Sequence, residues 1–145
     1  MKDLKIKLIK NKKELEQVLK IREIVFIKGQ NVPRWRERDK FDNVAKHVIV
    51  IYKNKPVGCA RIRFIGKKAK LERIALLKRY RSKGFGKAIM KYLINYAKKH
   101  KVKEIVLHSQ CYIKDFYKIC GFKPRGKTFM DAGIKHIEMY FKPKK

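Results

Sequence analysis

Acidic residues are scarce in this chain. Its 145 residues include 12 Asp and Glu against 41 Lys and Arg, which gives a formal net charge of +29. A chain with this charge attracts polyanions in a salt-dependent way. The basic residues are spread along the whole sequence and are not gathered in one tail or one helix. Nucleic-acid binding therefore stays an alternative that rests on charge alone.

Long apolar runs and a disulfide pattern are missing as well. No run approaches the roughly 18 to 20 apolar residues that a membrane-crossing helix needs. The opening MKDLKIKLIKNKK alternates charged with apolar residues and lacks the apolar core of a secretion signal. Cys59, Cys111 and Cys120 match no metal-ligand spacing and read as small, reduced, buried side chains. We expect a cytoplasmic protein without a metal site.

Two nucleotide-binding signatures are absent, while a third kind of glycine loop is present. Neither G-x-G-x-x-G nor G-x-x-x-x-G-K-[ST] occurs, so a Rossmann unit and a Walker A loop are not expected. Residues 81–86, RSKGFG, instead join a short apolar strand to a long amphipathic helix. A helix N-terminus offers unpaired N–H groups and positive potential, and glycine permits close approach. This loop is therefore predicted to hold a phosphate-bearing ligand.

Hydrophobic periodicity predicts a mixed α/β domain. Strand patterns occupy residues 4–8, 47–52, 57–65, 69–77, 104–108 and 137–141. Helical spacing of apolar residues occupies 15–26, 85–97 and 113–120. Asn11 is expected to cap the first helix and Pro33 to follow its end, with a loop or short helix over 34–43. The element order predicts one domain over residues 1–145, with helices able to cover both faces of one sheet.

The strand, the R-x-x-G-x-G loop and the helix resemble the acyl-CoA-binding motif of the GCN5-related N-acetyltransferases, the GNAT family. Residues 115–122, DFYKICGF, resemble the downstream F-Y-x-x-x-G-F element of that family, and the likeness covers essentially the whole chain. REIVF, QNVP and MDAGIKHI are similar to the branch of YjcF- and ElaA-like proteins. The resemblance implies the GNAT fold: a mostly antiparallel twisted sheet with a splayed strand pair and helices on both faces.

The resemblance also implies the donor and its binding site. The expected activity is acetyl-CoA-dependent transfer of an acetyl group to an amine, by direct attack in a ternary complex, without a metal or a covalent intermediate. Strand 72–76 would splay from strand 104–108 and expose backbone groups to the pantetheine arm. The Leu76 N–H would polarise the thioester carbonyl. The donor-binding residues expected are Ile74, Ala75, Leu76, Arg81, Ser82, Lys83, Gly84, Phe85, Gly86, Lys87 and Gln110.

Tyr117 and two possible bases are the predicted catalytic residues. Tyr117 matches the general acid of the family, which protonates the departing thiolate, although an aromatic residue there can also be core. Glu72 and His108 are the candidate bases. Glu72 can instead pair with Arg61 or Arg63 across a hairpin, and His108 can be a hydrogen-bonded strand histidine. A chain of water molecules could also serve as the base.

The acceptor site is less defined by the sequence. Arg22, Gln30 and Glu37 lie where the first helix enters its loop, a region that shapes the acceptor pocket in the family, and Glu37 is a further candidate base. Arg36 and Arg38 make this stretch basic, which disfavours a polycationic acceptor and favours an anionic or neutral amine, or a locally acidic protein.

Two further alternatives and the oligomeric state stay open. Asp131 and His136 either wall the substrate site or form a turn before the last strand. The basic charge leaves room for a GNAT-fold protein that binds nucleic acid or ribosomes, or for an acetyltransferase acting on tRNA or a ribosomal protein. The family resemblance implies a monomer or a homodimer.

Overall fold

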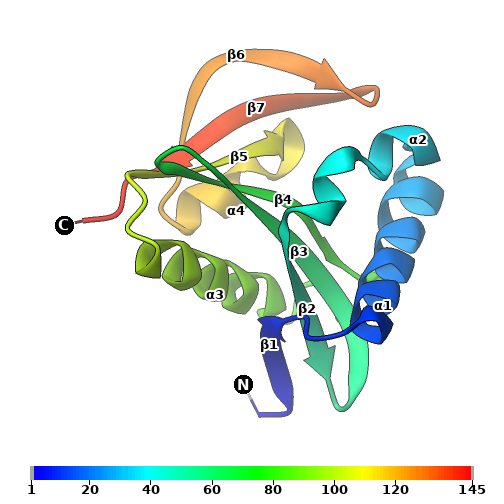
Figure 1. Cartoon of the computed structure of the whole chain (residues 1–145). Coiled ribbons are helices and arrows are strands. Elements are labelled where there is room, and N and C mark those ends of the chain that lie inside the picture. Colours follow the sequence, from blue (N-terminus) through cyan, green and yellow to red (C-terminus); the bar gives the residue numbers. More distant parts are fainter. Residues whose placement is uncertain (1, 145) are drawn as a thin grey trace.

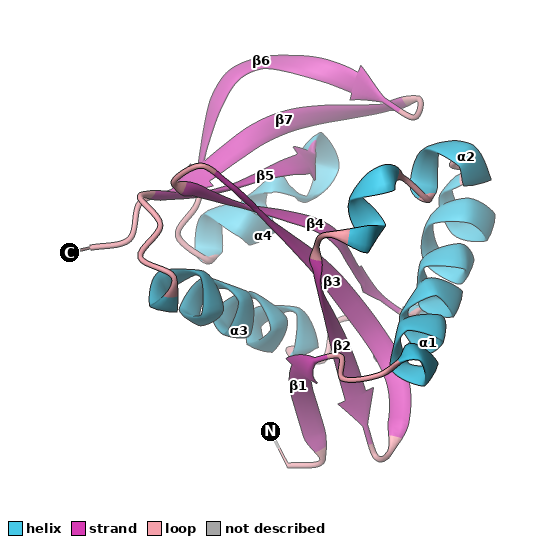
Figure 2. Cartoon of the chain, viewed as in Figure 1, coloured by secondary structure: helices cyan, strands magenta, loops and turns pink. Residues whose placement is uncertain are grey.

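A computed structural model describes residues 2–144 and shows one twisted seven-stranded sheet with helices on both of its faces (Figure 1, Figure 2). The strands are β1 (Leu4–Leu8), β2 (Lys46–Tyr52), β3 (Lys55–Ile65), β4 (Lys68–Leu76), β5 (Glu104–Gln110), β6 (Lys123–Asp131) and β7 (Ile134–Phe141). Their order in the sheet is β1-β2-β3-β4-β5-β7-β6, and every pair is antiparallel except β4 with β5. The predicted mixed, mostly antiparallel sheet is confirmed.

The helices occupy the predicted regions with one irregularity. They are α1 (Lys12–Arg22), α2 (Arg34–Glu37), α3 (Phe85–Lys99) and α4 (Lys114–Ile119), with a π-helix at Glu23–Lys28 and 3-10 turns at Lys40–Asn43, Lys78–Tyr80 and Cys111–Ile113. The Asn11 side chain accepts a hydrogen bond from the Glu14 N–H, so the predicted cap of α1 is confirmed. Within residues 2–144 no helix is long and apolar enough to span a bilayer.

Two hydrophobic cores lie on opposite faces of the sheet. Successive side chains of a strand point to opposite faces. Val48 and Val50 of β2 therefore pack in the core that contains Ile89 of α3, whereas Ile49 packs in the core that contains Val18 of α1. Each of these five side chains is completely buried. The sheet is thus held between α1 on one side and α3 on the other (Figure 1).

Strand β6 is an element that the sequence pattern did not predict. It pairs only with β7, and its register shifts between Arg125 and Phe129. Most of its residues are exposed on both faces, as is usual for an irregular edge strand. Its sequence KPRGKTFMD therefore lacks the alternation of apolar and polar residues that marks a half-buried strand.

Strands β4 and β5 pair only at their beginning. The parallel register runs from Lys68–Glu104 to Leu71–Leu107, after which β4 continues beside β3 and β5 continues beside β7. Arg73 adopts φ of 54° just beyond the last pair, and the β3–β4 register shifts at the same place. Such a β-bulge bends a strand. The predicted splay of these two strands is confirmed.

Buried arginines fix the segment after α2 to the sheet. Arg22 is fully buried; its Nε donates to Glu37 at 2.8 Å and its Nη1 to Asp42 at 2.7 Å. Arg61 of β3, also buried, donates to Asp42 at 2.8 Å. Burial disfavours its charge, yet hydrogen bonds and nearby carboxylates, those of Asp39 among them, raise the pKa of Arg61 above its usual value. Arg22 is therefore a structural residue within the fold.

Removing the Arg22 guanidinium should destabilise the fold strongly. Arg22→Met removes a fully buried partner that the carboxylates of Glu37 and Asp42 share, and breaking such a buried pair costs about 3 to 5 kcal/mol. Urea denaturation should show this loss of unfolding free energy. Arg34→Met, which removes an exposed pair with Glu23, is the matched control and should lose much less. Equal stabilities of the two variants would contradict the structural role of Arg22.

Candidate active site

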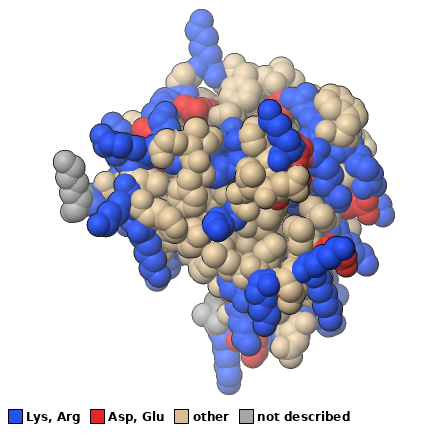
Figure 3. All heavy atoms as spheres, viewed as in Figure 1, with Lys and Arg blue, Asp and Glu red and all other residues tan. Residues whose placement is uncertain are grey.

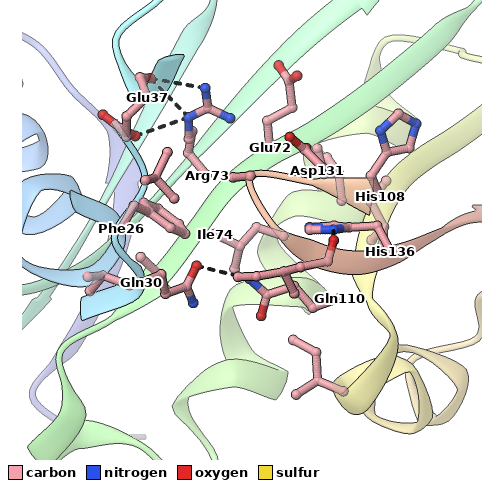
Figure 4. Close-up of a pocket in the computed structure, with 18 of the residues that line it drawn as sticks. Phe26, Gln30, Glu37, Glu72, Arg73, Ile74, His108, Gln110, Asp131 and His136 are labelled. Carbon is pink, nitrogen blue, oxygen red and sulfur yellow. Dashed lines mark hydrogen bonds and ion pairs between the residues drawn. The ribbon is translucent and has the colours of Figure 1, made fainter. Parts of the chain in front are cut away.

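A cavity of about 610 Å³ opens where β4 and β5 diverge (Figure 4). Residues from the π-helix region, β4, β5, α4 and the β6–β7 turn line it. Its size is in the range of small-molecule and cofactor sites. It is lined by the predicted donor-binding residues Ile74, Ala75, Leu76, Arg81 and Gln110, by the predicted catalytic residues Tyr117, Glu72 and His108, and by Gln30 and Glu37 of the predicted acceptor site. The predicted phosphate-binding residues 82–87 are not among its lining residues and lie in the loop before α3 and the first turn of that helix.

The edge of β4 offers backbone groups to this cavity. The Leu77 N–H donates to the Val57 carbonyl of β3 at 2.9 Å. Backbone groups alternate in direction along a strand, so those of Ile74 and Leu76 face away from β3 and toward the gap. Ala75 pairs with β3, and its side chain is buried in the α1 core. Of the three predicted strand residues, two therefore present hydrogen-bonding groups to the cavity.

The Leu76 carbonyl already has a partner. The Arg81 side chain folds back from the glycine loop, and its Nε donates to this oxygen at 2.9 Å. Arg81 thus lies across the end of β4, between the strand edge and the helix N-terminus. A ligand that pairs with the Leu76 carbonyl must therefore displace this side chain or share the oxygen with it.

The glycine loop has the backbone geometry of a tight turn into α3. Ser82 and Gly84 adopt φ of 62° and 84°, and Gly84 is the residue immediately before the helix. A Cβ on Gly86 would lie 3.1 Å from the Phe116 ring, so any larger residue there requires this ring to shift. The Phe85 side chain is buried 4.9 Å from the Tyr52 ring centroid. Phe85 can therefore contribute to a ligand site only through its backbone.

Tyr117 is both a core residue and a cavity residue. Its ring packs against Phe116 and Phe122 at centroid distances of 5.1 and 6.3 Å, and 8% of the residue is exposed. Burial raises the pKa of Tyr117 to about 12, so the phenol keeps its proton at neutral pH. A protonated phenol that lines the cavity has the chemistry of a general acid.

The two candidate bases differ in their surroundings. Glu72 receives hydrogen bonds from Arg63 at 2.6 Å and Arg61 at 3.0 Å, as the ion-pair alternative predicted. Burial opposes its charge, but these arginines and Lys70 lower the pKa of Glu72, which makes its carboxylate a weak base. For His108, burial and then the charge of Lys70 lower the pKa below its ordinary value, which favours the neutral ring, the form that can accept a proton.

The opposite wall of the cavity is built mainly by side-chain contacts. The Gln110 amide donates to the Gln30 side chain at 2.9 Å across the cavity (Figure 4). Glu37 is 1% exposed and forms ion pairs with three arginines, one of which, Arg73, lines the cavity. Arg22, predicted to contact the acceptor, does not reach the cavity, because it is fully buried behind Glu37.

The β6–β7 turn completes this wall. Asp131 ends β6 and pairs with Arg36 of α2, while His136 of β7 stacks on Phe129. Gly133 lies in the turn with φ of 78°. Asp131 and His136 flank this turn and both line the cavity. The two alternatives, a wall of the site and a turn before the last strand, therefore hold together.

Cysteine and metal chemistry receive no support from the described part of the chain. Cys59, Cys111 and Cys120 are free thiols, and burial raises the pKa of the two that are most enclosed, Cys59 and Cys120. Across residues 2–144 no group of three or more His, Cys, Asp or Glu side chains is arranged to hold a metal ion.

Comparison with known proteins places the sequence with acetyltransferases of the GNAT family and the fold with solved acetyltransferase structures. Residues 14–143 match the family model described as acetyltransferase (GNAT) domain. The chain is 39% identical over 137 residues to the uncharacterized N-acetyltransferase YjcF of Bacillus subtilis, covering 94% of this chain and 98% of YjcF. Escherichia coli ElaA superposes with a TM-score of 0.86 at 20% identity, over 96% of this chain and 99% of ElaA. A B. subtilis acetyltransferase in complex with CoA superposes with a TM-score of 0.70 at 18% identity, over 97% and 99%.

The pKa of His108 should lie below its ordinary value of 6.5. An NMR titration of the ring should therefore show a midpoint below 6.5. The unfolded chain then takes up this proton more readily than the folded chain, so wild type should lose stability relative to His108→Gln as the pH falls through about 6.5. Glu138→Gln is the control: the Glu138 carboxylate, 3.4 Å away, opposes the shift, so its removal should lower the midpoint further. A midpoint at or above 6.5 would contradict this description.

Proposed function

The chain belongs to the GNAT acetyltransferase family, and from this premise we propose that it transfers the acetyl group of acetyl-CoA to an amine in a ternary complex. One observation carries the proposal: the edge of β4 that β5 leaves unpaired borders a cavity, and the 3-10 turn Lys78–Tyr80 joins this strand to the R-x-x-G-x-G loop at the start of α3. A strand edge recognises an amide-rich chain, and a helix N-terminus recognises phosphate. Both features match the chemistry of CoA, which a structurally similar B. subtilis acetyltransferase binds.

The donor half of the site would work mainly through its backbone. Ile74 and Leu76 would pair with the pantetheine amides, after Arg81 leaves the Leu76 carbonyl. The N–H groups around Gly84 and Gly86 would hold the pyrophosphate, and Ser82, Lys83 and Lys87 would add donors and charge. Acetyl-CoA supplies the activated acyl group as a thioester.

Two side chains would then handle the protons. Tyr117 would donate its phenol proton to the departing sulfur, because its raised pKa keeps the phenol protonated at neutral pH. His108 would accept the proton that the amine loses, directly or through water. Glu72 is less suited to this role, because three cations already hold its charge.

A nucleic-acid-binding function without catalysis is not favoured. Lys and Arg are scattered over the face seen in Figure 3 and do not form one continuous track. Specific binding to a nucleic-acid backbone needs basic groups arranged along its path. On this face the surplus charge therefore adds general attraction to anions and does not define a separate site.

Acetyl-CoA should bind saturably, with an affinity that depends on the glycine loop. Gly84→Ala adds a Cβ at the ligand site and strains a left-handed residue, and we expect at least a ten-fold weaker Kd by calorimetry at moderate salt. Gly66→Ala is the matched control, since Gly66 also has a positive φ (58°) but lies in the open β3–β4 turn. Both variants carry about 1 to 2 kcal/mol of similar strain. Equal effects on Kd, or no saturable binding by wild type, would contradict the proposed donor site.

Tyr117→Phe should remove the general acid and keep the fold. We expect turnover to fall roughly 10²-fold or more, the range for general acid–base catalysis, with an unchanged Kd for acetyl-CoA. Thiol release is measured with the best acceptor from a screen of amines, amino sugars, polyamines and peptides. Tyr112→Phe is the control, because Tyr112 also lines the cavity but is 74% exposed. Turnover of Tyr117→Phe equal to that of wild type would remove the assignment.

A further inference from the structure

A connected network of ion pairs forms and supports the cavity wall that contains Glu37, Glu72 and Arg73. Its members are joined by N–O distances of 4.0 Å or less, and we call it the acceptor-side network. The six cations are Arg22, Arg38, Arg61, Arg63, Lys70 and Arg73, and the four carboxylates are Glu37, Asp39, Asp42 and Glu72. The network therefore carries two more positive than negative side chains.

The carboxylates that line the cavity are all engaged. Glu37 pairs with three arginines, Glu72 pairs with two arginines and Lys70, and Asp131 pairs with Arg36. A polyamine would have to break one of these pairs to gain a carboxylate of its own. The cavity thus offers little to an acceptor with additional positive charge.

Arg73 is one of the two cations of the network that line the cavity, the other being Lys70. The bulged backbone of Arg73 turns its side chain along the cavity, where it lies beside Glu37 (Figure 4). Nε donates to the Glu37 carbonyl and lies 3.1 Å from a Glu37 carboxylate oxygen, while Nη2 donates to the carbonyls of Arg36 and Glu37 and to Asp39. Among the residues that the structure describes, none accepts a hydrogen bond from Nη1 of Arg73. The Arg73 side chain is 24% exposed to solvent.

The electrostatic surroundings of Arg73 agree with an unsatisfied positive charge. Burial, and next the neighbouring charge of Arg61, lower the pKa of Arg73, in contrast to the raised pKa of Arg61 itself. The carboxylates of Glu37 and Asp39 only partly compensate. An anion bound at Nη1 would supply the missing compensation.

We propose that Arg73 binds a carboxylate or phosphate group of the acceptor, so that the substrate is an amine that also carries negative charge. This inference rests on the proposed function. A guanidinium donates well-oriented hydrogen bonds to either anion. Arg73 precedes Leu76 by three residues, about 10 Å at about 3.3 Å per residue of strand. A small molecule can therefore place its anion at Arg73 and its amine near the thioester end of the site.

Calorimetric titration of the CoA-saturated protein tests the proposal. The probes are γ-aminobutyrate and phosphoethanolamine, which distinguish a carboxylate from a phosphate site, and butylamine and putrescine, which lack an anion. At least one anionic amine should bind saturably, at least ten-fold more tightly than butylamine and putrescine. Failure of both anionic amines to saturate, or equal or tighter binding of butylamine or putrescine, would overturn the proposal.

Variants show whether Arg73 is responsible. Arg73→Gln should weaken binding of the anionic amine at least ten-fold and leave butylamine unchanged, and Arg73→Lys should retain part of the affinity. Arg34→Gln is the matched control, because Arg34 lies on α2 outside the cavity lining and should bind as wild type does. Thermal melts identify a variant that does not fold, in which case Arg73→Lys alone decides. Undiminished binding by a folded Arg73 variant would overturn the assignment.

The same samples separate this inference from the function on which it rests. CoA binding is measured first, and the amine titrations are repeated without CoA. Loss of CoA binding would count against the proposed donor site, even where the anionic amine still binds. Normal CoA binding without preference for the anionic amine would count against the role of Arg73 alone.

Discussion

Two arginines without access to water constrain the acceptor half of this molecule. Removing a guanidinium from water costs several kcal/mol, which only well-placed carboxylates can offset. Arg22 and Arg61 are fully buried or nearly so, and they share the carboxylate of Asp42. The segment from α2 to Asp42 must therefore lie against the sheet whenever the protein is folded. The wall of the cavity is thus set by charge compensation rather than by apolar packing.

The proposed donor half depends instead on hydrogen bonds that the sheet does not make, because the pairing of β4 with β5 stops at Leu71. β4 leaves β5 after four paired residues, and the bulge at Arg73 lies directly beyond that point. The same bulge leaves the backbone of Ile74 and Leu76 facing the cavity, where the proposed donor would bind, and places the Arg73 side chain in the acceptor-side network. One irregular residue thereby links the two halves of the site.

These two halves differ in how far the sequence could predict them. The glycine loop and its flanking strand are contiguous, and the function proposed for them depends on backbone geometry, so a short sequence pattern is sufficient to propose it. The acceptor wall is assembled from side chains far apart in the chain. Arg22 was predicted to contact substrate and is instead buried, because the sequence does not distinguish a buried arginine from an exposed one. Arg73 was overlooked for the same reason, and the irregular edge strand β6 lacked the alternation that would have revealed it.

The large positive charge takes on a different meaning once the ion pairs are known. Ten of the 12 Asp and Glu side chains form ion pairs. The surplus is therefore carried by exposed Lys and Arg, whose field attracts any anion and weakens with salt. CoA is an anion, and an acceptor held by Arg73 would be another. Salt dependence alone hence cannot distinguish a nucleic-acid binder from this enzyme, whereas a local change at Gly84 or Arg73 can, because the general field is left almost intact.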